Sequence, residues 1–461
     1  MDGGGEDGRI RTGTLWTGTA HASTAIVGSG ILALPWCVAQ LGWVLGPITI
    51  LAFAIITYYI GILLCDCYRV PDPINGRRNY TYTDAVKSLL GAKSVIISGM
   101  MQYSLLWGTM IGFTITTATS VASVKKSTCL HHKGENNSAN CRVSGNAYMI
   151  IYGAMEIVLS QCPNLEKATI LSVIATVTSI LYAMVAFGLS TAKFFSQPQF
   201  RGSLMMSKMV GVGETSSTTN KIWHIFQALG NIAFSYTYSI LLMEIQDTLK
   251  SPPAENKIMK RVTMYSIGGT GLFYVGLACM GYAAFGNHVP GNILTGFHQP
   301  FWLVDIANLA VILHLIGAYQ VFAQPVFAIH EKCIASRWPA SPFNRNHTIK
   351  LPCSLITIDF KLSKLLLRTV FVVLTTTIAM MFPFFNAVLG VLGSISFWPL
   401  TIYFPLNMYM AQVKIKRGSP TWILYQILSL VCFVVTLLCL VGSIADILQR
   451  FKHAKLFHIE P

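Results

Sequence analysis

The chain has 461 residues, of which 53% are hydrophobic and only 11% are charged, and its formal net charge is +15. Soluble domains usually carry roughly 25% charged residues, so this composition argues against a water-soluble fold. The Lys and Arg residues are scattered through short connectors and form no basic stripe with interleaved aromatic residues, which argues against nucleic acid as a partner.

Apolar runs of about twenty residues, the length at which a helix crosses a bilayer, recur along the chain. They predict an all-α membrane protein with about 11 transmembrane helices. The predicted spans are 18–40, 43–66, 94–123, 146–161, 167–190, 221–246, 262–285, 301–327, 369–385, 387–411 and 421–446. The polar N-terminal tail, 1–17, does not have the pattern of a cleavable signal peptide.

An odd number of spans places the two termini on opposite sides of the membrane. If the N-terminus is cytoplasmic, the inner segments hold 22 Lys and Arg residues and the outer segments hold 11. The positive-inside rule therefore predicts a cytoplasmic N-terminus and an extracellular C-terminal tail, 447–461.

Two cysteines differ from the others, which lie in or beside apolar spans. Cys129 and Cys141 flank a polar loop that this topology places outside, where a disulfide is chemically permitted, and we predict that they pair. The same loop contains Asn136 within an Asn-Asn-Ser sequence, which makes it a candidate for glycosylation. Cys65 and Cys67 lack further Cys or His partners nearby in sequence, so we expect no metal site there.

The first and sixth spans are interrupted at matching depths. The first contains Gly28, Gly30 and Pro35, and the sixth contains the polar and aromatic run 231–239. Within hydrocarbon, unwound backbone is tolerated only where protein or a water-filled cavity surrounds it. Two matched interruptions therefore predict an inverted-repeat transporter with its binding site between the halves.

The expected repeats are two five-helix segments followed by one extra helix. They cover about 18–190, 221–411 and 421–446, within a single transmembrane domain at 18–446. The alternative for the glycines of the first span is that they only allow close helix packing, and the second interruption favours a binding site instead.

The chemistry of the two interruptions suits a zwitterion. A half-helix that begins after Gly30 would present free N–H groups and a positive dipole end to a carboxylate. Carbonyl groups freed near Ser235 and Tyr236 would suit an ammonium group. The predicted substrate is therefore an amino acid, and the predicted binding residues are Gly28, Ser29, Gly30, Tyr103, Phe234, Ser235 and Tyr236.

Ionisable residues inside spans are costly and are therefore candidates for a function. Those considered for carrying a proton are His21, His314, Glu244 and Asp305. For the two histidines the alternative is a neutral, hydrogen-bonded side chain in the core. For the two carboxylates it is a position at the level of the lipid headgroups.

Several motifs along the chain make a family resemblance recognisable. They are Arg11-Thr-Gly-Thr-Leu-Trp-Thr17, Gly28-Ser-Gly-Ile-Leu-Ala-Leu-Pro-Trp36, Asp66-Cys-Tyr-Arg69, Met243-Glu-Ile-Gln-Asp-Thr-Leu-Lys250, Gly281-Tyr-Ala-Ala-Phe-Gly286 and His314-Leu-Ile-Gly-Ala-Tyr-Gln320. Together they resemble the plant amino acid permeases of the amino acid/auxin permease family over nearly the whole chain.

The resemblance implies a leucine-transporter-type fold, proton symport of amino acids and a place in the plasma membrane. It also implies importance for histidines at the positions of His21 and His314. Asn231 departs from the family, in which many members have an aspartate, so an ionisable role is lost there. No cofactor is expected other than H⁺ as the coupling ion.

The choice of H⁺ over Na⁺ also has support from the residues. Sodium prefers oxygen ligands, and in transporters of this fold hydroxyl groups of the eighth helix commonly help to hold it. The eighth span, 301–327, contains no Ser or Thr. Histidine, with an unperturbed pKa near 6.5, changes charge in the mildly acidic range instead, and His21 is the first choice.

Three other functions were weighed. An ion channel would require a repeated pore element, which the sequence lacks. An intramembrane enzyme would require a nucleophile or metal motif, and neither a Gly-x-Ser-x-Gly turn nor a His-Glu-x-x-His pair is present. An amino acid sensor built on a transporter fold would usually carry a long soluble region, and the tails here are short.

Overall fold

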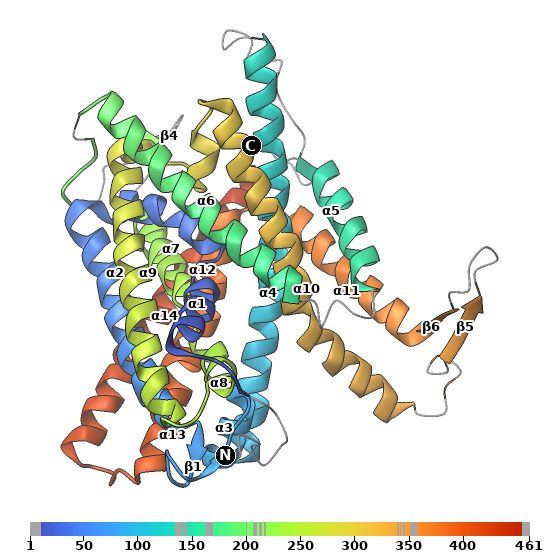
Figure 1. Ribbon diagram of the computed structural model, residues 1–461. Helices are drawn as coiled ribbons and strands as arrows, with labels where there is room; N and C mark the ends of the chain where they lie inside the picture. The colour runs from blue at the N-terminus through green and yellow to red at the C-terminus, as the bar shows by residue number, and fades with distance from the viewer. Residues whose placement is uncertain are drawn as a thin grey trace. The chain divides into compact units, whose positions relative to one another are not determined.

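The computed structural model describes residues 11–133, 141, 145–161, 169–199, 201–205, 210–211, 214–215, 218–338, 341, 343, 346–350 and 357–453 (Figure 1). Asn136, the glycosylation candidate, lies outside these residues. Within them, nine helical runs are long and apolar enough to cross a membrane. The chain separates into two compact units, which are described one at a time.

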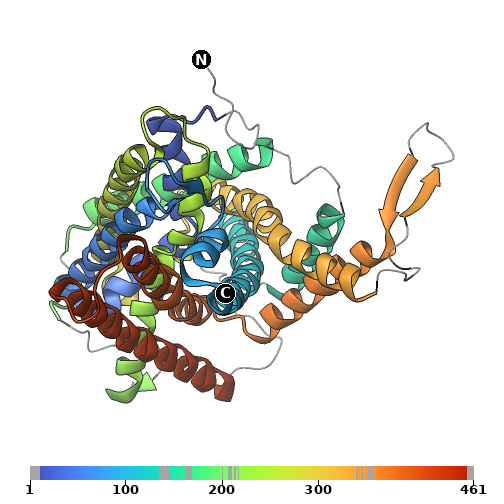
Figure 2. The ribbon, with the colours of Figure 1, turned by 90° about the horizontal axis from the view of Figure 1, so that it is seen from below.

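Unit 1 comprises Met1–Leu105, Ala183–Phe297 and Phe385–His453. Its helices and strands are α1 (Leu15–Ile26), η1 (Ser29–Ala33), α2 (Leu34–Asp66), β1 (Arg69–Val70), β2 (Arg77–Arg78), α3 (Tyr82–Leu90), β3 (Val210–Gly211), β4 (Glu214–Thr215), α7 (Thr218–Ser235), α8 (Ser239–Asp247), α9 (Glu255–Phe285), η4 (Gly286–His288), η5 (Ile293–Gly296), α12 (Phe385–Ser396), η7 (Phe397–Tyr403), α13 (Phe404–Val413) and α14 (Pro420–His453). The long helices α2 and α9 run side by side (Figures 1 and 2).

Unit 2 comprises Leu106–Tyr182, His298–Phe384 and Ala454–Pro461. Its own elements are α5 (Gly145–Ser160), α10 (Phe301–Arg337), β5 (Asn346–Lys350), β6 (Thr357–Lys361) and α11 (Leu362–Met381). Two helices, α4 (Ala92–Lys133) and α6 (Thr169–Ser196), begin in one unit and end in the other. The hairpin of β5 and β6 projects beyond the ends of α10 and α11 (Figure 2).

A break at Gly42 separates the first two expected spans. The helix α2 has 33 residues, about 50 Å at 1.5 Å per residue, which is longer than one crossing requires. Gly42 has a φ of 85°, a conformation that favours glycine. The turn is held by the backbone N–H of Trp43, which donates to the carbonyl oxygen of Ser203 at 3.1 Å. The expected spans 18–40 and 43–66 lie on either side of this break.

The compact units cut across the two repeats that the sequence predicts. Unit 1 contains the spans expected to be first and second and also those expected to be sixth and seventh, which are the corresponding pairs of the two repeats. Unit 2 contains those expected to be fourth, eighth and ninth. The repeat boundaries at about 18–190 and 221–411 remain a prediction.

Glycines bring the backbone of α7 against two neighbouring helices of unit 1. A Cβ atom added at Gly230 would lie 2.7 Å from the carbonyl oxygen of Gly390 on α12. One added at Gly442 on α14 would lie 2.8 Å from the carbonyl oxygen of Trp223 on α7. Small residues permit this close approach in membrane helices, where packing rather than hydrophobic burial drives association.

Candidate functional site

The first helix of unit 1 is interrupted where the sequence predicts. A capping box formed by Thr14 and Thr17 starts α1, and Ile26 ends it. Gly28 is extended, with φ −113° and ψ −167°, and the short buried helix η1 follows. The hydroxyl of Tyr274 on α9 donates to the freed carbonyl oxygen of Ile26 at 2.7 Å. The carbonyl group freed by the break therefore has a hydrogen-bond partner on a neighbouring helix.

The second interruption lies between α7 and α8. Residues 236–238 separate the end of α7 at Ser235 from the start of α8 at Ser239. The hydroxyl of Ser235 donates to the carbonyl oxygen of Asn231 at 3.1 Å. Thr237 and Ser396 have their hydroxyl oxygens 3.4 Å apart, which ties this turn to the end of α12.

The two interruptions contact each other at Gly30. A Cβ atom added at Gly30 would lie 2.8 Å from the hydroxyl oxygen of Ser235 and 3.1 Å from Cδ1 of Phe234. At Gly28, by contrast, an added Cβ would have nothing within 4 Å. The side chains of Ser235 and Phe234 therefore pack tightly against the backbone at Gly30, while there is open space beside Gly28.

Polar groups without helical partners lie within the two interruptions. Ser29 and Gly30 open η1, so their backbone N–H groups have no partner within that helix. Tyr236 is fully buried, and its hydroxyl has no hydrogen-bond partner among the described residues, with the ring of Tyr274 centred 5.5 Å away. N–H donors and a buried hydroxyl are groups that can bind a carboxylate.

Six of the seven predicted binding residues thus belong to the two interruptions. Tyr103 is half-buried on α4, and its approach to the site remains a prediction.

The four proton candidates occupy unlike surroundings. His21 and Glu244 are exposed on α1 and α8, and Asp305 is half-buried with the hydroxyl of Thr128 at 3.5 Å.

His314 is a buried histidine of unit 2. Its Nδ1 lies 2.8 Å from the carbonyl oxygen of Ala175, and its ring is centred 5.7 Å from that of Tyr182. Because a carbonyl oxygen only accepts, Nδ1 carries the hydrogen in this contact. The arrangement is that of a hydrogen-bonded core histidine, the alternative weighed from the sequence.

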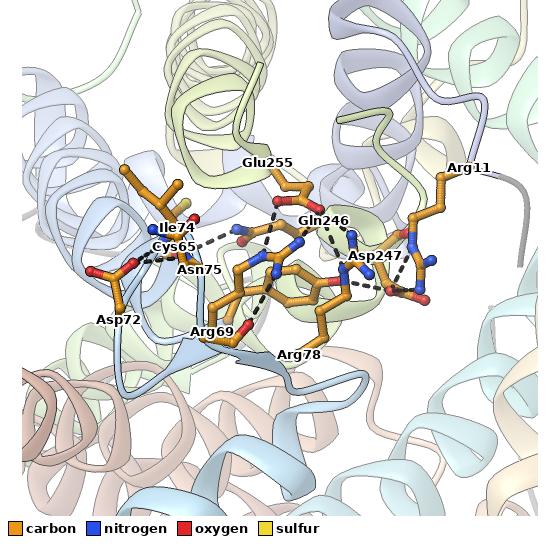
Figure 3. A network of polar contacts seen from close by, with 12 residues as sticks. Arg11, Cys65, Arg69, Asp72, Ile74, Asn75, Arg78, Gln246, Asp247 and Glu255 are labelled. Carbon is orange, nitrogen blue, oxygen red and sulfur yellow. Dashed lines mark hydrogen bonds and ion pairs between the residues drawn. The ribbon is translucent and has the colours of Figure 1, made fainter. Parts of the chain in front are cut away.

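A polar network lies at the end of unit 1 where α8 ends and α9 begins (Figure 3). Arg11 forms an ion pair with Asp247 at 2.8 Å, and the hydroxyl of Tyr68 donates to the same carboxylate at 2.6 Å. The N-terminal segment is also hydrogen-bonded to the end of α8, because the backbone N–H of Gly13 donates to the carbonyl oxygen of Thr248 at 2.9 Å.

The same network contains a buried carboxylate with two arginine partners. Glu255, 1% exposed, pairs with Arg69 at 2.7 Å and with Arg78 at 2.9 Å. Gln246 donates from Nε2 to the carbonyl oxygen of Cys65 at 3.0 Å (Figure 3). The N-terminal segment, the end of α2, the β1–β2 hairpin, α8 and α9 are thereby joined.

Two groups outside the spans, one in the network and one beside it, have shifted pKa values. Burial, followed by the neighbouring Asp247 carboxylate, raises the pKa of Tyr68, so this hydroxyl remains a neutral donor. Asp72 lies beside the network in an exposed turn, and the backbone N–H groups of Asn75 and Ile74 hold its pKa below the usual range. Sequence patterns assigned no role to Arg11, Asp247 or Glu255, although Arg11 and Asp247 occur in the motifs that carry the family resemblance.

Comparisons with known proteins agree with this architecture. Residues 11–449 match the family described as transmembrane amino acid transporter protein. The chain is a member of this family. It is 48% identical to amino acid permease 8 of Arabidopsis thaliana over 458 residues, which cover 98% of this chain and 95% of that protein.

Further relatives agree with that family. The transporter is 48% identical to amino acid permease 6 of Arabidopsis thaliana, across 98% of this chain and 94% of that protein. Among solved structures it resembles MhsT in complex with L-phenylalanine, with a TM-score of 0.53 at 10% identity, covering 95% of this chain and all of that one. The fold is therefore of the leucine-transporter type. The protein is a plant-type multi-pass membrane transporter of amino acids and not an enzyme.

Proposed function

We propose that the transporter imports amino acids together with protons by alternating access, across the plasma membrane and with its N-terminus in the cytoplasm. The observation that carries this proposal is the contact of the two helix interruptions at Gly30, Phe234 and Ser235. Unwound backbone at this contact leaves N–H and C=O groups free to bind a ligand, whereas an intact helix would use them in its own hydrogen bonds.

The substrate's carboxylate would bind the N–H groups of Ser29 and Gly30 at the start of η1, where the helix dipole favours a negative charge. The open space at Gly28 leaves room for the ligand beside this backbone. The hydroxyl of Tyr236 would supply a further contact, and Phe234 would contact the substrate's side chain. The ammonium group would be held by carbonyl oxygens released at the interruptions.

The network of Figure 3 would close the inner side of unit 1. The helix α8, which follows the second interruption, ends at Asp247, and this residue contacts both Arg11 and Tyr68. An inward opening that displaces α8 would therefore have to break these contacts. Their loss would need to be offset by substrate and coupling-ion binding.

The side chains of the eighth span favour proton coupling over sodium coupling. The part of α10 within 301–327 has no Ser or Thr, whose hydroxyl groups commonly help to hold Na⁺ in transporters of this fold. Protons need only a titratable group, and His21 remains the first of the sequence candidates, ahead of His314, Glu244 and Asp305.

Uptake of a panel of labelled amino acids in a transport-deficient cell tests the proposal and identifies the substrates. We expect saturable uptake that is greater at acidic than at neutral external pH. Saturable uptake of amino acids without such a pH dependence would remove proton coupling and leave the amino acid site. Specific binding without uptake would favour the amino acid sensor.

A further inference from the structure

A buried carboxylate on α14 contacts the first half of α7 within unit 1. Asp446 on α14 is 2% exposed. It accepts hydrogen bonds from Nε2 of Gln227 at 3.1 Å and from Nε of Arg450 at 2.8 Å, and Nε2 of His224 lies 3.2 Å from its other oxygen. It is the only acidic residue of α14.

A buried carboxylate is a costly way to join two helices. Glycine packing at Gly442 already brings α14 against α7, so the helices do not need a charge between them to make contact. Ionisable groups buried within membrane spans are rare and usually have a function. The charged groups that act on Asp446 are His224 from α7 and Arg450 from α14 itself. The third helix of this contact, α12, has no ionisable residue.

Polar atoms without partners lie where α7 and α14 meet α12 at Gly390. Oε1 of Gln227 and the hydroxyl of Ser443 are buried and have no hydrogen-bond partner in the part of the chain that the structure describes. Asn231 is fully buried, and apart from a contact with the Cys37 thiol neither atom of its side-chain amide has a partner. Such groups are costly to leave unpaired, so the observed arrangement is not fully satisfied, and one of similar cost in which other atoms are unpaired can compete with it.

Protonation of Asp446 provides such an arrangement. The ionised carboxylate only accepts, and it now takes the N–H of Gln227. When a proton from water binds one oxygen, an O–H bond forms and the acid becomes a donor. After rotation of the Gln227 amide, this donor can reach Oε1, which now lacks a partner, and Nε2 gives up its contact with the carboxylate in exchange.

The contacts lie on the helix that leads to the substrate site. His224, Gln227, Asn231 and Ser235 recur every three or four residues and therefore share one face of α7. From the first to the last of them the helix rises about 16 Å. Ser235 is the residue that meets Gly30 at the interruption.

We propose that Asp446 is a proton-binding site of the transporter and that Gln227 and His224 connect its charge state to α7. This inference rests on the proposed proton coupling and adds Asp446 to the residues that could carry the proton. The proton would bind Asp446 from the outer side, change the hydrogen bonds of α7, and so alter the position of the interruption at Ser235.

The test is Asp446→Asn, which keeps the size of the side chain and imitates the neutral acid. Uptake at external pH 5 and pH 7.5 is compared with exchange of internal for external amino acid at equal pH on both sides. We expect the ratio of uptake at the two pH values to fall to about one, while exchange stays within about two-fold of the unmodified protein. Thr421→Ala, which removes an exposed hydroxyl near the other end of α14, should leave both unchanged.

A purely structural role gives a different result. Asp446→Asn would then reduce uptake and exchange together and keep the pH ratio of the unmodified protein, which overturns the site. His224→Gln is a second variant, for which we expect a shifted pH midpoint of uptake; an unshifted midpoint also counts against the site. Uptake by the unmodified protein that ignores pH would instead reject proton coupling as a whole.

Discussion

At Gly30, the absence of a side chain lets two interrupted helices meet. Replacing it with leucine would place a bulky group where Ser235 and Phe234 lie about 3 Å away. We expect Gly30→Leu to abolish amino acid uptake, at least ten-fold below the unmodified protein, while the protein still reaches the cell surface.

Gly188→Leu is the matched control for that change. Gly188 is exposed on α6, and a Cβ atom added there would have nothing within 4 Å. Uptake and surface labelling of this variant should match the unmodified protein. Normal uptake by Gly30→Leu would exclude the interruption as the substrate site.

Asp247 allows a second test at the scale of a single residue. Asp247→Asn removes the charge that Arg11 and Tyr68 share, and hydrogen bonds to charged groups contribute about 1.5–3 kcal/mol each. Weakening the inner closure should favour inward-open states and raise the KM for external substrate by roughly ten-fold. Asp72→Asn, in the neighbouring exposed turn, should leave KM unchanged, and an unchanged KM for both variants would contradict a closing role.

The sequence anticipates some of these residues better than others. Glycine, proline and polar residues inside an apolar span are visible in a one-dimensional pattern, so both interruptions could be predicted. The partners of Asp247 and Asp446 are not visible in this way, because Arg11 and His224 lie more than two hundred residues away along the chain. His21, whose depth in the sequence suggested burial, is exposed because α1 packs on α9 and α8 through other residues.

At the scale of helices and loops, the paired cysteines join the last turns of α4 to the connection that leads to α5. Cys129 and Cys141 form a disulfide with their Cα atoms 5.8 Å apart. Closing a loop of this size stabilises a fold by roughly 3 kcal/mol in the chain-entropy account. We expect the double variant Cys129→Ser/Cys141→Ser to lower the melting temperature and to leave the KM nearly unchanged.

Peptide mass spectrometry under non-reducing conditions checks the pairing directly. A linked peptide containing both cysteines is expected for protein taken from the plasma membrane. Two free thiols would contradict the pairing and would also weaken the assignment of this loop to the outside.

Helix ends were predicted less accurately than the helices themselves. The ninth span was expected at 369–385, but α11 covers Leu362–Met381. The expected end is wrong because residues 382–384 are not helical, and Phe382 precedes a proline, which disfavours helical backbone. At the other end the helix continues into basic, less apolar residues, and hydropathy does not mark that boundary.

For the whole molecule, the sequence predicted the fold class and the family, because both depend on features spread over the entire chain. The long apolar spans correspond to the long helices of the structure, and the expected family agrees with relatives that are 46–48% identical. How spans group into compact units was not predicted, because the pairing of distant helices depends on side-chain packing that a hydropathy pattern does not contain.

Substrate-evoked currents, recorded while external pH and sodium are varied independently, test proton-coupled import most directly. We predict inward currents that rise on acidification, persist when sodium is replaced by a large organic cation, and reverse with the proton gradient. The same recording on His21→Ala separates this histidine from the other candidates. Currents that follow sodium and are indifferent to pH would contradict proton-coupled amino acid import by this transporter.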